Sequence, residues 1–240
     1  MASPPFRFKK FLVEQQGAAH PVGTDGVLLG AWADISGATR MLDIGTGTGL
    51  VALMLAQRTE HLPDVQITGI ELDQDSFLCA QQNFAASPWA GRLAAVGQSV
   101  QDFAQNAAGR YDLIVSNPPF FTETVVSPDK KRQLSRAARS LTPGDLLDAV
   151  DRLLSPQGKF CAILPPVEGR RLCEWGAMCG LYSTWETQVF ARMGKPYERL
   201  LLLLQRDPFP MYRSRLYIYE KEEVWSEGFK ALTSAFYLDF

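Results

Sequence analysis

The chain has few of the residues that most often hold zinc. Only two histidines occur among its 240 residues, and its four cysteines form no C-x-x-C pair. This composition argues against a zinc site, and we expect no bound metal. Scattered cysteines of this kind are typical of reduced thiols in a cytoplasmic protein. They are Cys79, Cys161, Cys173 and Cys179.

The chain also lacks a long apolar run and a strong net charge. No apolar stretch is long enough to cross a membrane, and the segment from Met1 to Pro5 does not resemble a signal peptide. We therefore expect a cytoplasmic protein without a membrane partner. The formal net charge is -2, so any nucleic-acid binding needs a local basic patch rather than the field of the whole molecule.

Short apolar segments alternate with helical ones along most of the sequence. This alternation predicts an α/β fold: a mainly parallel, twisted sheet with helices on both faces and an antiparallel C-terminal hairpin. A capping residue, Thr24 or Asp25, precedes the first helix. We expect strands at 39–44, 65–71, 93–96, 111–116, 158–164, 184–192 and 198–206, and helices at 26–33, 50–58, 75–86, 141–154 and 168–179.

The length suits a single domain, which we place at 1–240. It divides into an N-terminal hairpin and helix at 1–37, a catalytic core at 38–206 and a C-terminal extension at 207–240. We expect a monomer.

A glycine-rich turn lies between the strand at 39–44 and the following helix. Its spacing is G-x-G-x-G after Asp43, whereas a dinucleotide site would use G-x-G-x-x-G. An acid there would repel a pyrophosphate but suits a cationic amino group, and Glu71, at the end of the next strand, can accept both hydroxyls of a ribose. The pattern indicates S-adenosyl-L-methionine. A nicotinamide cofactor, a turn without a ligand, and Glu71 as a solvated strand end are the alternatives.

The sequence Asn117-Pro118-Pro119-Phe120 directly follows the strand at 111–116. Proline fixes φ and has no backbone donor, so the loop is stiff and its carbonyls can accept hydrogen bonds. The ring of Phe120 can stack, while the Asn117 oxygen and a backbone carbonyl accept two N–H bonds. Such a loop suits a flat, amino-bearing group, either a base or a side-chain amide. The alternative is a strand-ending turn whose prolines provide only stiffness.

This motif resembles the (N/D/S)-P-P-(Y/F/W) motif of class I methyltransferases that act on planar nitrogens. Those enzymes include adenine-N6, rRNA guanine-N2 and release-factor glutamine methyltransferases. Further blocks resemble the bacterial tRNA1(Val) (adenine(37)-N6)-methyltransferases, which implies a Rossmann-like fold with a seven-stranded sheet and methylation of an adenine in the anticodon loop. These blocks are 6–11, 22–32, 194–196 and 229–238.

The resemblance implies two groups of site residues. The catalytic residues are Asn117, Pro118 and Phe120. Ser99 occupies the position where the family has an acid, so the cofactor adenine would be recognised by Ser99 or by the backbone of Val100. Asp102 is the alternative, or it caps the segment 103–107. The cofactor-binding residues are Thr24, Asp43, Gly45, Thr46, Gly47, Glu71, Leu72, Ser99, Val100 and Asn117.

A basic stretch follows the catalytic motif and is our candidate RNA-binding segment. If it is helical, its three arginines share one face beside the motif and could hold phosphates. The alternative is a solvated cationic face. The RNA-binding candidates are Lys130, Lys131, Arg132, Arg136 and Arg139; Arg7, Lys9, Lys10, Arg213 and Arg215 could extend the patch. Tyr212, Tyr217 and Tyr219 could stack bases, although sheet packing is the expected role of at least two of them.

Three rival functions remain at this point, and one of them is an rRNA guanine-N2 methyltransferase, which shares the motif. A protein glutamine methyltransferase would use the same motif, but that family carries a substantial N-terminal domain, for which the segment before Thr39 is too short. A catalytically inert, RNA-binding relic of the fold is the third rival, and the intact Asp43, Glu71 and Asn117 argue against it.

Overall fold

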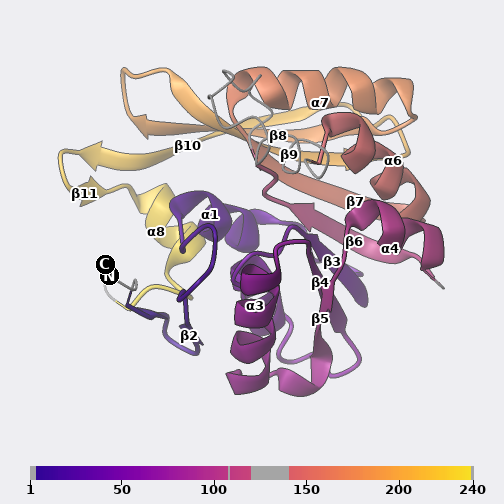
Figure 1. Ribbon diagram of the computed structural model, residues 1–240. Coiled ribbons are helices and arrows are strands. Elements are labelled where there is room, and N and C mark those ends of the chain that lie inside the picture. The colour runs from indigo at the N-terminus through magenta and orange to yellow at the C-terminus, as the bar shows by residue number, and fades with distance from the viewer. Residues whose placement is uncertain (1–3, 108, 120–140, 239–240) are drawn as a thin grey trace, which may run out of the picture.

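The computed structural model describes residues 4–107, 109–119 and 141–238. Within them lie a nine-stranded mixed sheet and a separate two-stranded hairpin (Figure 1). The strands are β1 (Phe6–Arg7), β2 (Leu12–Val13), β3 (Arg40–Ile44), β4 (Gln66–Glu71), β5 (Leu93–Gly97), β6 (Tyr111–Ser116), β7 (Leu154–Leu164), β8 (Tyr182–Arg192), β9 (Tyr197–Gln205), β10 (Tyr212–Lys221) and β11 (Val224–Trp225).

The helices lie on both faces of the sheet, as the alternating pattern predicts. They are α1 (Thr24–Trp32), α2 (Leu50–Arg58), α3 (Gln74–Ala86), α4 (Val100–Asn106), α6 (Pro143–Leu153), α7 (Pro166–Met178) and α8 (Glu227–Thr233), with a short 3-10 turn at Ala90–Arg92. One hydrophobic core joins the sheet to α1, α2, α3 and α8, and a second joins it to α4, α6 and α7. No helix in the described part of the chain is long and apolar enough to span a bilayer.

The strand order of the large sheet is β11-β10-β8-β9-β7-β6-β3-β4-β5. The strands β5, β4, β3, β6 and β7 are parallel, and β8 and β9 form the expected antiparallel hairpin. The α/β fold class is therefore confirmed. The carboxyl ends of β3, β4, β5 and β6 meet at one edge, which is where open α/β sheets bind ligands.

The prediction of seven strands is too low. The C-terminal extension adds β10, which runs parallel to β8, and β11, which runs antiparallel to β10. In β10 the apolar residues Leu216 and Ile218 pack against the core, while Arg213 and Arg215 alternate with them and are exposed. The charged and aromatic residues of this segment suggested an RNA-binding patch, and their alternation with apolar residues was not recognised as a strand.

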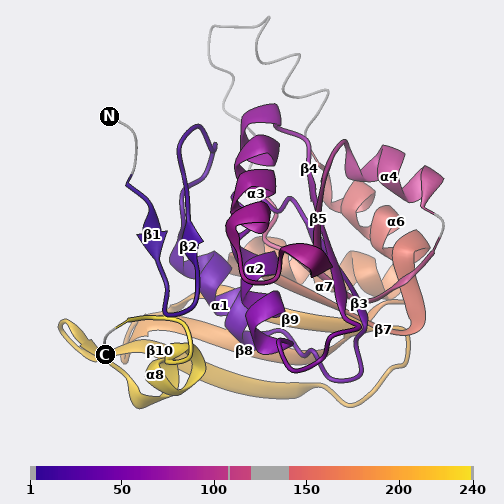
Figure 2. The ribbon, with the colours of Figure 1, turned by 90° about the horizontal axis from the view of Figure 1, so that it is seen from below.

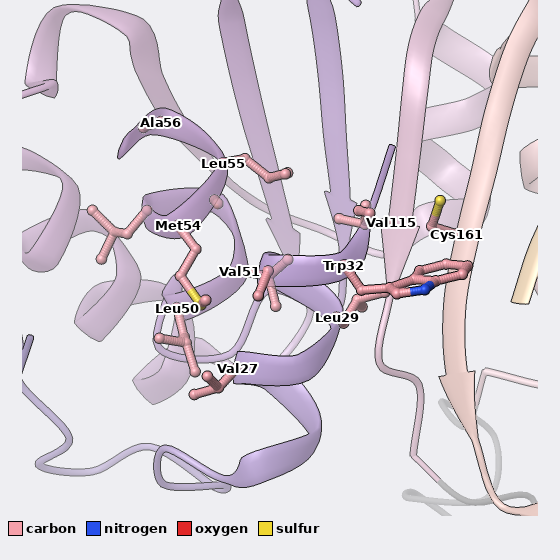
Figure 3. Close-up of a cluster of buried hydrophobic side chains, with 14 of the residues drawn as sticks. Val27, Leu29, Trp32, Leu50, Val51, Met54, Leu55, Ala56, Val115 and Cys161 are labelled. Atoms are coloured by element: carbon pink, nitrogen blue, oxygen red, sulfur yellow. The ribbon is translucent and has the colours of Figure 1, made fainter. Parts of the chain in front are cut away.

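The helices α1 and α2 pack closely against each other. A Cβ at Gly30 would lie 2.7 Å from the sulfur of Met54, so only glycine permits this approach. Figure 3 shows the side chains of both helices beside Val115 of β6 and Cys161 of β7. The expected cap of α1 is wrong, because the N-cap is Gly23 and Thr24 is already helical.

The two ends of the described chain pack together on α2. The Lys9 amide donates to the Phe236 carbonyl at 2.8 Å, and the Gln57 side-chain amide donates to the Ala235 carbonyl at 2.8 Å. The ring of Phe8 lies 6.0 Å from that of Tyr237. Figure 2 shows the β1–β2 hairpin, α1 and α8 on the same side of the sheet.

The glycine-rich turn joins α2 at Gly49, and a substitution at this residue tests how tightly the turn is packed. Its φ is +84°, and a Cβ there would lie 2.5 Å from the ring of Phe84. We expect Gly49→Ala to lower the free energy of unfolding by about 3 kcal/mol, because left-handed strain costs about 1–2 kcal/mol and a clash in a packed interior about 1–3 kcal/mol. Urea denaturation measures the loss.

Gly37→Ala is the matched control for this substitution. Gly37 has a φ of +73°, but a Cβ there meets nothing within 4 Å. The control should therefore lose only about 1–2 kcal/mol from backbone strain. Equal losses in the two variants would show that contact with Phe84 does not constrain the turn.

Candidate active site

A cavity of about 990 Å³ lies at the carboxyl ends of the parallel strands. The strands β3, β4 and β6 lead into it, and the starts of α1, α2 and α4 surround it. Its lining comes from within the segments 19–26, 43–51, 70–76, 98–101 and 117–119, together with Leu141 and Arg199.

Asp43 ties the end of β3 to the start of α2. Its Oδ2 accepts a hydrogen bond from the Thr46 hydroxyl at 2.6 Å and another from the Ala52 backbone amide at 3.3 Å. The turn between them is also fixed to the neighbouring strand, because the amides of Gly45 and Thr46 both donate to the Ile70 carbonyl at 2.9 Å. Strand, turn and helix are therefore held as one unit.

Asp43 is buried, with 1% of the residue exposed. Burial raises its pKa from the ordinary value of 3.8 to about 7; the hydrogen bonds from Thr46 and Ala52 oppose this rise, and the nearby charge of Glu71 adds to it. Asp43 therefore changes its protonation state near neutral pH. A cation in the cavity would favour the ionised form.

Glu71 faces the same cavity from the end of β4. Its Oε2 accepts from the Gly47 amide and its Oε1 accepts from the Asp73 amide, each at 2.9 Å. A carboxylate oxygen has two lone pairs, so both oxygens can accept a further hydrogen bond from a ligand hydroxyl. Leu72, which follows it, is 42% exposed and offers an apolar surface at the cavity.

At the start of α4, Ser99 and not Asp102 caps the helix. Ser99 is the N-cap: its hydroxyl accepts from the Asp102 amide at 3.1 Å and donates to the Asp102 carboxylate at 2.6 Å. Ser99 and Val100 line the cavity, whereas Asp102 is outside its lining. Because Val100 is the first residue of α4, its backbone N–H has no partner within the helix.

Asn117, Pro118 and Pro119 line the cavity on the side of β6. Ser116 is buried and donates from its hydroxyl to the Ile44 carbonyl at 2.9 Å, and it pairs with Ile44 in the register of β3 and β6. Asn117 is therefore held next to Gly45. The motif and the glycine-rich turn form two adjacent walls of the cavity.

Three charged residues that line the cavity, Asp25, Asp73 and Arg199, were not among the predicted site residues. Asp25, in the first turn of α1, pairs with Arg199, near the start of β9, with 2.7 Å between Oδ2 and Nε. Asp25 stood within a block that carried the family resemblance. Arg199 directly precedes five consecutive leucines, and a cation at the head of such a buried run could have drawn attention to it.

All ten predicted cofactor-binding residues line this cavity, and so does the catalytic candidate Pro118. Phe120 and the RNA-binding candidates Lys130, Lys131, Arg132, Arg136 and Arg139 lie outside the described residues. Within 4–107, 109–119 and 141–238, no group of three or more His, Cys, Asp or Glu side chains could hold a metal ion.

The sequence matches a family model over about half of its length and curated proteins over nearly its whole length. Residues 26–155 match the family described as Methyltransferase small domain. A protein of Histophilus somni (strain 2336) is 42% identical over 236 residues, which cover 98% of each chain. A protein of Yersinia enterocolitica is 41% identical over 235 residues, covering 98% of this chain and 93% of the other. Both are named tRNA1(Val) (adenine(37)-N6)-methyltransferase.

Solved structures share the fold at low sequence identity. A predicted O-methyltransferase from Agrobacterium tumefaciens superposes with a TM-score of 0.68 at 15% identity, covering 88% of this chain and 96% of the other. TrmK from M. capricolum, in complex with S-adenosyl-homocysteine, gives a TM-score of 0.53 at 12% identity, covering 80% of this chain and 71% of the other. At these identities the likeness concerns the fold alone.

The raised pKa of Asp43 predicts a stability effect with a defined sign. The folded state holds the proton more tightly than the unfolded state, so the stabilising effect of the protonated carboxyl is present below about pH 4 and is lost as the pH rises through about 7. Asp43→Asn stays neutral at every pH and keeps an acceptor for Thr46 and Ala52. Its stability relative to the original protein should therefore rise between about pH 5 and about pH 8.

Urea denaturation across this range measures the difference. Asp34→Asn is the control, because the hydrogen bonds from Lys159 and Ser36 outweigh the effect of burial and lower the pKa of Asp34, so its carboxyl is ionised in both states throughout the range. The control difference should be flat. A flat difference for Asp43→Asn as well would contradict a raised pKa at Asp43.

Proposed function

Because this chain belongs to the Methyltransferase small domain family and, within it, to the tRNA1(Val) (adenine(37)-N6)-methyltransferases, we propose that it methylates the exocyclic N6 of an adenine in tRNA. The donor is S-adenosylmethionine, and the target is adenine 37 in the anticodon loop of tRNA1(Val). The enzyme acts in the cytoplasm as a monomer. The observation that carries the proposal is that Asn117 and Pro118 line the same cavity as Asp43 and Glu71.

The polar groups of the cavity fit the donor from end to end. Asp43 and the turn at Gly45 and Gly47, where no side chain blocks a close approach to the backbone, suit its amino-acid end, with Thr24 at the start of α1. Glu71 suits the two ribose hydroxyls, because each of its oxygens already has one backbone donor and can accept another. The Val100 amide and the apolar side chain of Leu72 suit the adenine ring. When bound, the donor supplies a methyl group on a positively charged sulfur.

Asn117 and Pro118 act on the amine that receives the methyl group. An amine on a purine ring is a weak nucleophile because its lone pair is delocalised into the ring. The Asn117 Oδ1 and the Pro118 carbonyl accept its two hydrogens, which orients the nitrogen and stabilises the positive charge that develops on it. Pro118 is buried and has no backbone N–H. The loop therefore has no N–H at this position that could compete with the amine for the Asn117 and Pro118 oxygens.

The target base must leave its neighbours to enter the cavity. A base in a loop is less constrained than one in a duplex, so the cost of extruding it is lower. We propose that Phe120 stacks on the extruded base. We further propose that Lys130, Lys131, Arg132, Arg136 and Arg139 contact phosphates near it.

The test is methylation of total tRNA with a labelled donor, followed by nucleoside analysis. The original protein should yield N6-methyladenosine in tRNA1(Val). Asn117→Ala should lose methyl transfer by at least about a hundredfold, because it removes one of the two acceptors. Its Kd for the donor should stay within about three-fold, since Asn117 acts on the base.

Other outcomes separate the rival functions. N2-methylguanosine in rRNA or methylation of a protein glutamine would replace the adenine assignment. Absence of donor binding by calorimetry would indicate an inert relic of the fold. A parallel loss of donor binding in Asn117→Ala would assign Asn117 to the cofactor instead of to catalysis.

A second prediction concerns the ribose site. Glu71→Gln keeps an oxygen for the Gly47 amide but removes the charge that strengthens hydrogen bonds from the ribose. We expect the Kd for the donor to rise roughly ten-fold, which corresponds to about 1.4 kcal/mol. Glu60→Gln is the control, because Glu60 pairs with Lys10 outside the cavity and should leave the Kd unchanged. Equal values for the two variants would remove Glu71 from the ribose site.

A further inference from the structure

The strands β8 and β10 form three side-by-side pairs whose side chains lie on the same side of the sheet as α7. Opposite one another are Glu186 and Arg213, Gln188 and Arg215, and Phe190 and Tyr217. Side chains two residues apart on a strand point to the same face, so the pairs share one surface. We call this surface the β8–β10 face; it consists of Arg213, Arg215, Tyr217, Glu186, Gln188, Phe190 and Arg192.

This face lies beyond the cover of the helices. The helix α7 packs on β8 and β9, and α8 packs on the opposite face of β10, against Leu216. Figure 1 shows β10 and β11 extending past the end of α7. Arg213 and Arg215 are accordingly exposed, with 63% of the Arg213 side chain open to solvent.

The exposed charge of the face is positive. Its carboxylate, Glu186, is 0% exposed and is engaged by Arg170 through two hydrogen bonds, at 2.6 and 3.2 Å. Arg213 lies 3.9 Å from the same carboxylate. At the border of the face, Arg192 pairs with Glu222 at 3.6 Å. In a chain with a net charge of -2, this is a local basic patch of the kind that nucleic-acid binding requires.

Aromatic rings lie at the end of the β8–β10 face that is nearest the active-site edge of the sheet. Phe190 and Tyr217 are stacked with their centroids 4.8 Å apart, and Tyr197 meets Phe190 edge-on at 5.8 Å. Both Phe190 and Tyr217 are partly exposed. Rings next to arginines suit an RNA strand, because bases stack on rings while guanidinium groups bind phosphates.

The face is within reach of the catalytic motif. The strands β6, β8 and β10 all run in the same direction, so their carboxyl ends lie at one edge of the sheet. Four strand steps separate β10 from β6 in the order β10-β8-β9-β7-β6. At about 4.8 Å a step this distance is roughly 20 Å, which a few nucleotides can span.

We propose that the β8–β10 face binds the tRNA substrate beside the target base. Arg213 and Arg215 contact phosphates, and the Phe190–Tyr217 stack contacts the sugar or base next to them. The proposal rests on the proposed function and adds a second contact region, about 20 Å from the base that is methylated. Phosphate contacts position an RNA without reading its sequence, so this face sets affinity and orientation.

The test is the double substitution Arg213→Ala with Arg215→Ala in the full chain, assayed with purified tRNA1(Val). We expect the KM for tRNA to rise at least about ten-fold while kcat and the Kd for the donor stay unchanged. Two lost phosphate contacts should also reduce the slope of log affinity against log salt by about 1.5–2. Arg152→Ala is the matched control, since Arg152 is an exposed arginine near the end of α6, at the opposite edge of the sheet.

Arg215→Ala alone keeps the test valid if the double variant is destabilised, because Arg215 pairs with Gln188 and not with the buried Glu186. An unchanged KM and salt slope, in an enzyme that still modifies tRNA, would overturn the proposal and leave the function standing. An equal rise in KM for Arg152→Ala would also overturn the proposal, because the rise would then result from the more negative net charge of the protein and not from the loss of contacts at this face. Failure of the original protein to bind or methylate tRNA would overturn both.

Discussion

The hydrogen bonds that Asp43 accepts are the interaction on which the site depends. A carboxylate in the interior is costly unless donors surround it, and here Thr46 and Ala52 supply them from the turn and from α2. These bonds fix the angle at which the chain leaves β3 and enters α2. The second wall is fixed in the same way, since Ser116 donates to Ile44 and so keeps Asn117 beside the turn.

The first helix is placed by packing. The close contact of Gly30 with Met54 sets α1 on α2, and the Asp25–Arg199 pair joins its first turn to β9. The cavity is thus bounded by segments that are far apart in the sequence, from Ala19 to Arg199. The core strands supply its floor, and α1 and β9 close one side of it.

Most of the fold and much of the site could be predicted because their determinants are local. The alternation of apolar strands and helices gave the sheet, and the spacing after Asp43 and the residues from Asn117 to Pro119 marked two walls of one cavity. Such local patterns do not predict contacts between segments that are distant in the sequence. The pairing of Asp25 with Arg199 depends on α1 packing across β9, and β10 reads as a strand only once α8 is known to cover Leu216. The capping role of Ser99 was missed because Ser and Asp three residues apart fit more than one local structure.

The way in which the two ends of the chain meet has a consequence for synthesis. The backbone of Lys9 bonds to Phe236, and the ring of Phe8 lies beside that of Tyr237. More than two hundred residues separate these partners in the sequence, and the ribosome synthesises the N-terminal one first. The aromatic cluster around the N-terminal hairpin can therefore form only after α8 has left the exit tunnel. Until then Phe8 lacks its cover. The nascent protein can build its central sheet early, but the contacts between α1 and α8 form only after α8 has been made and has left the exit tunnel.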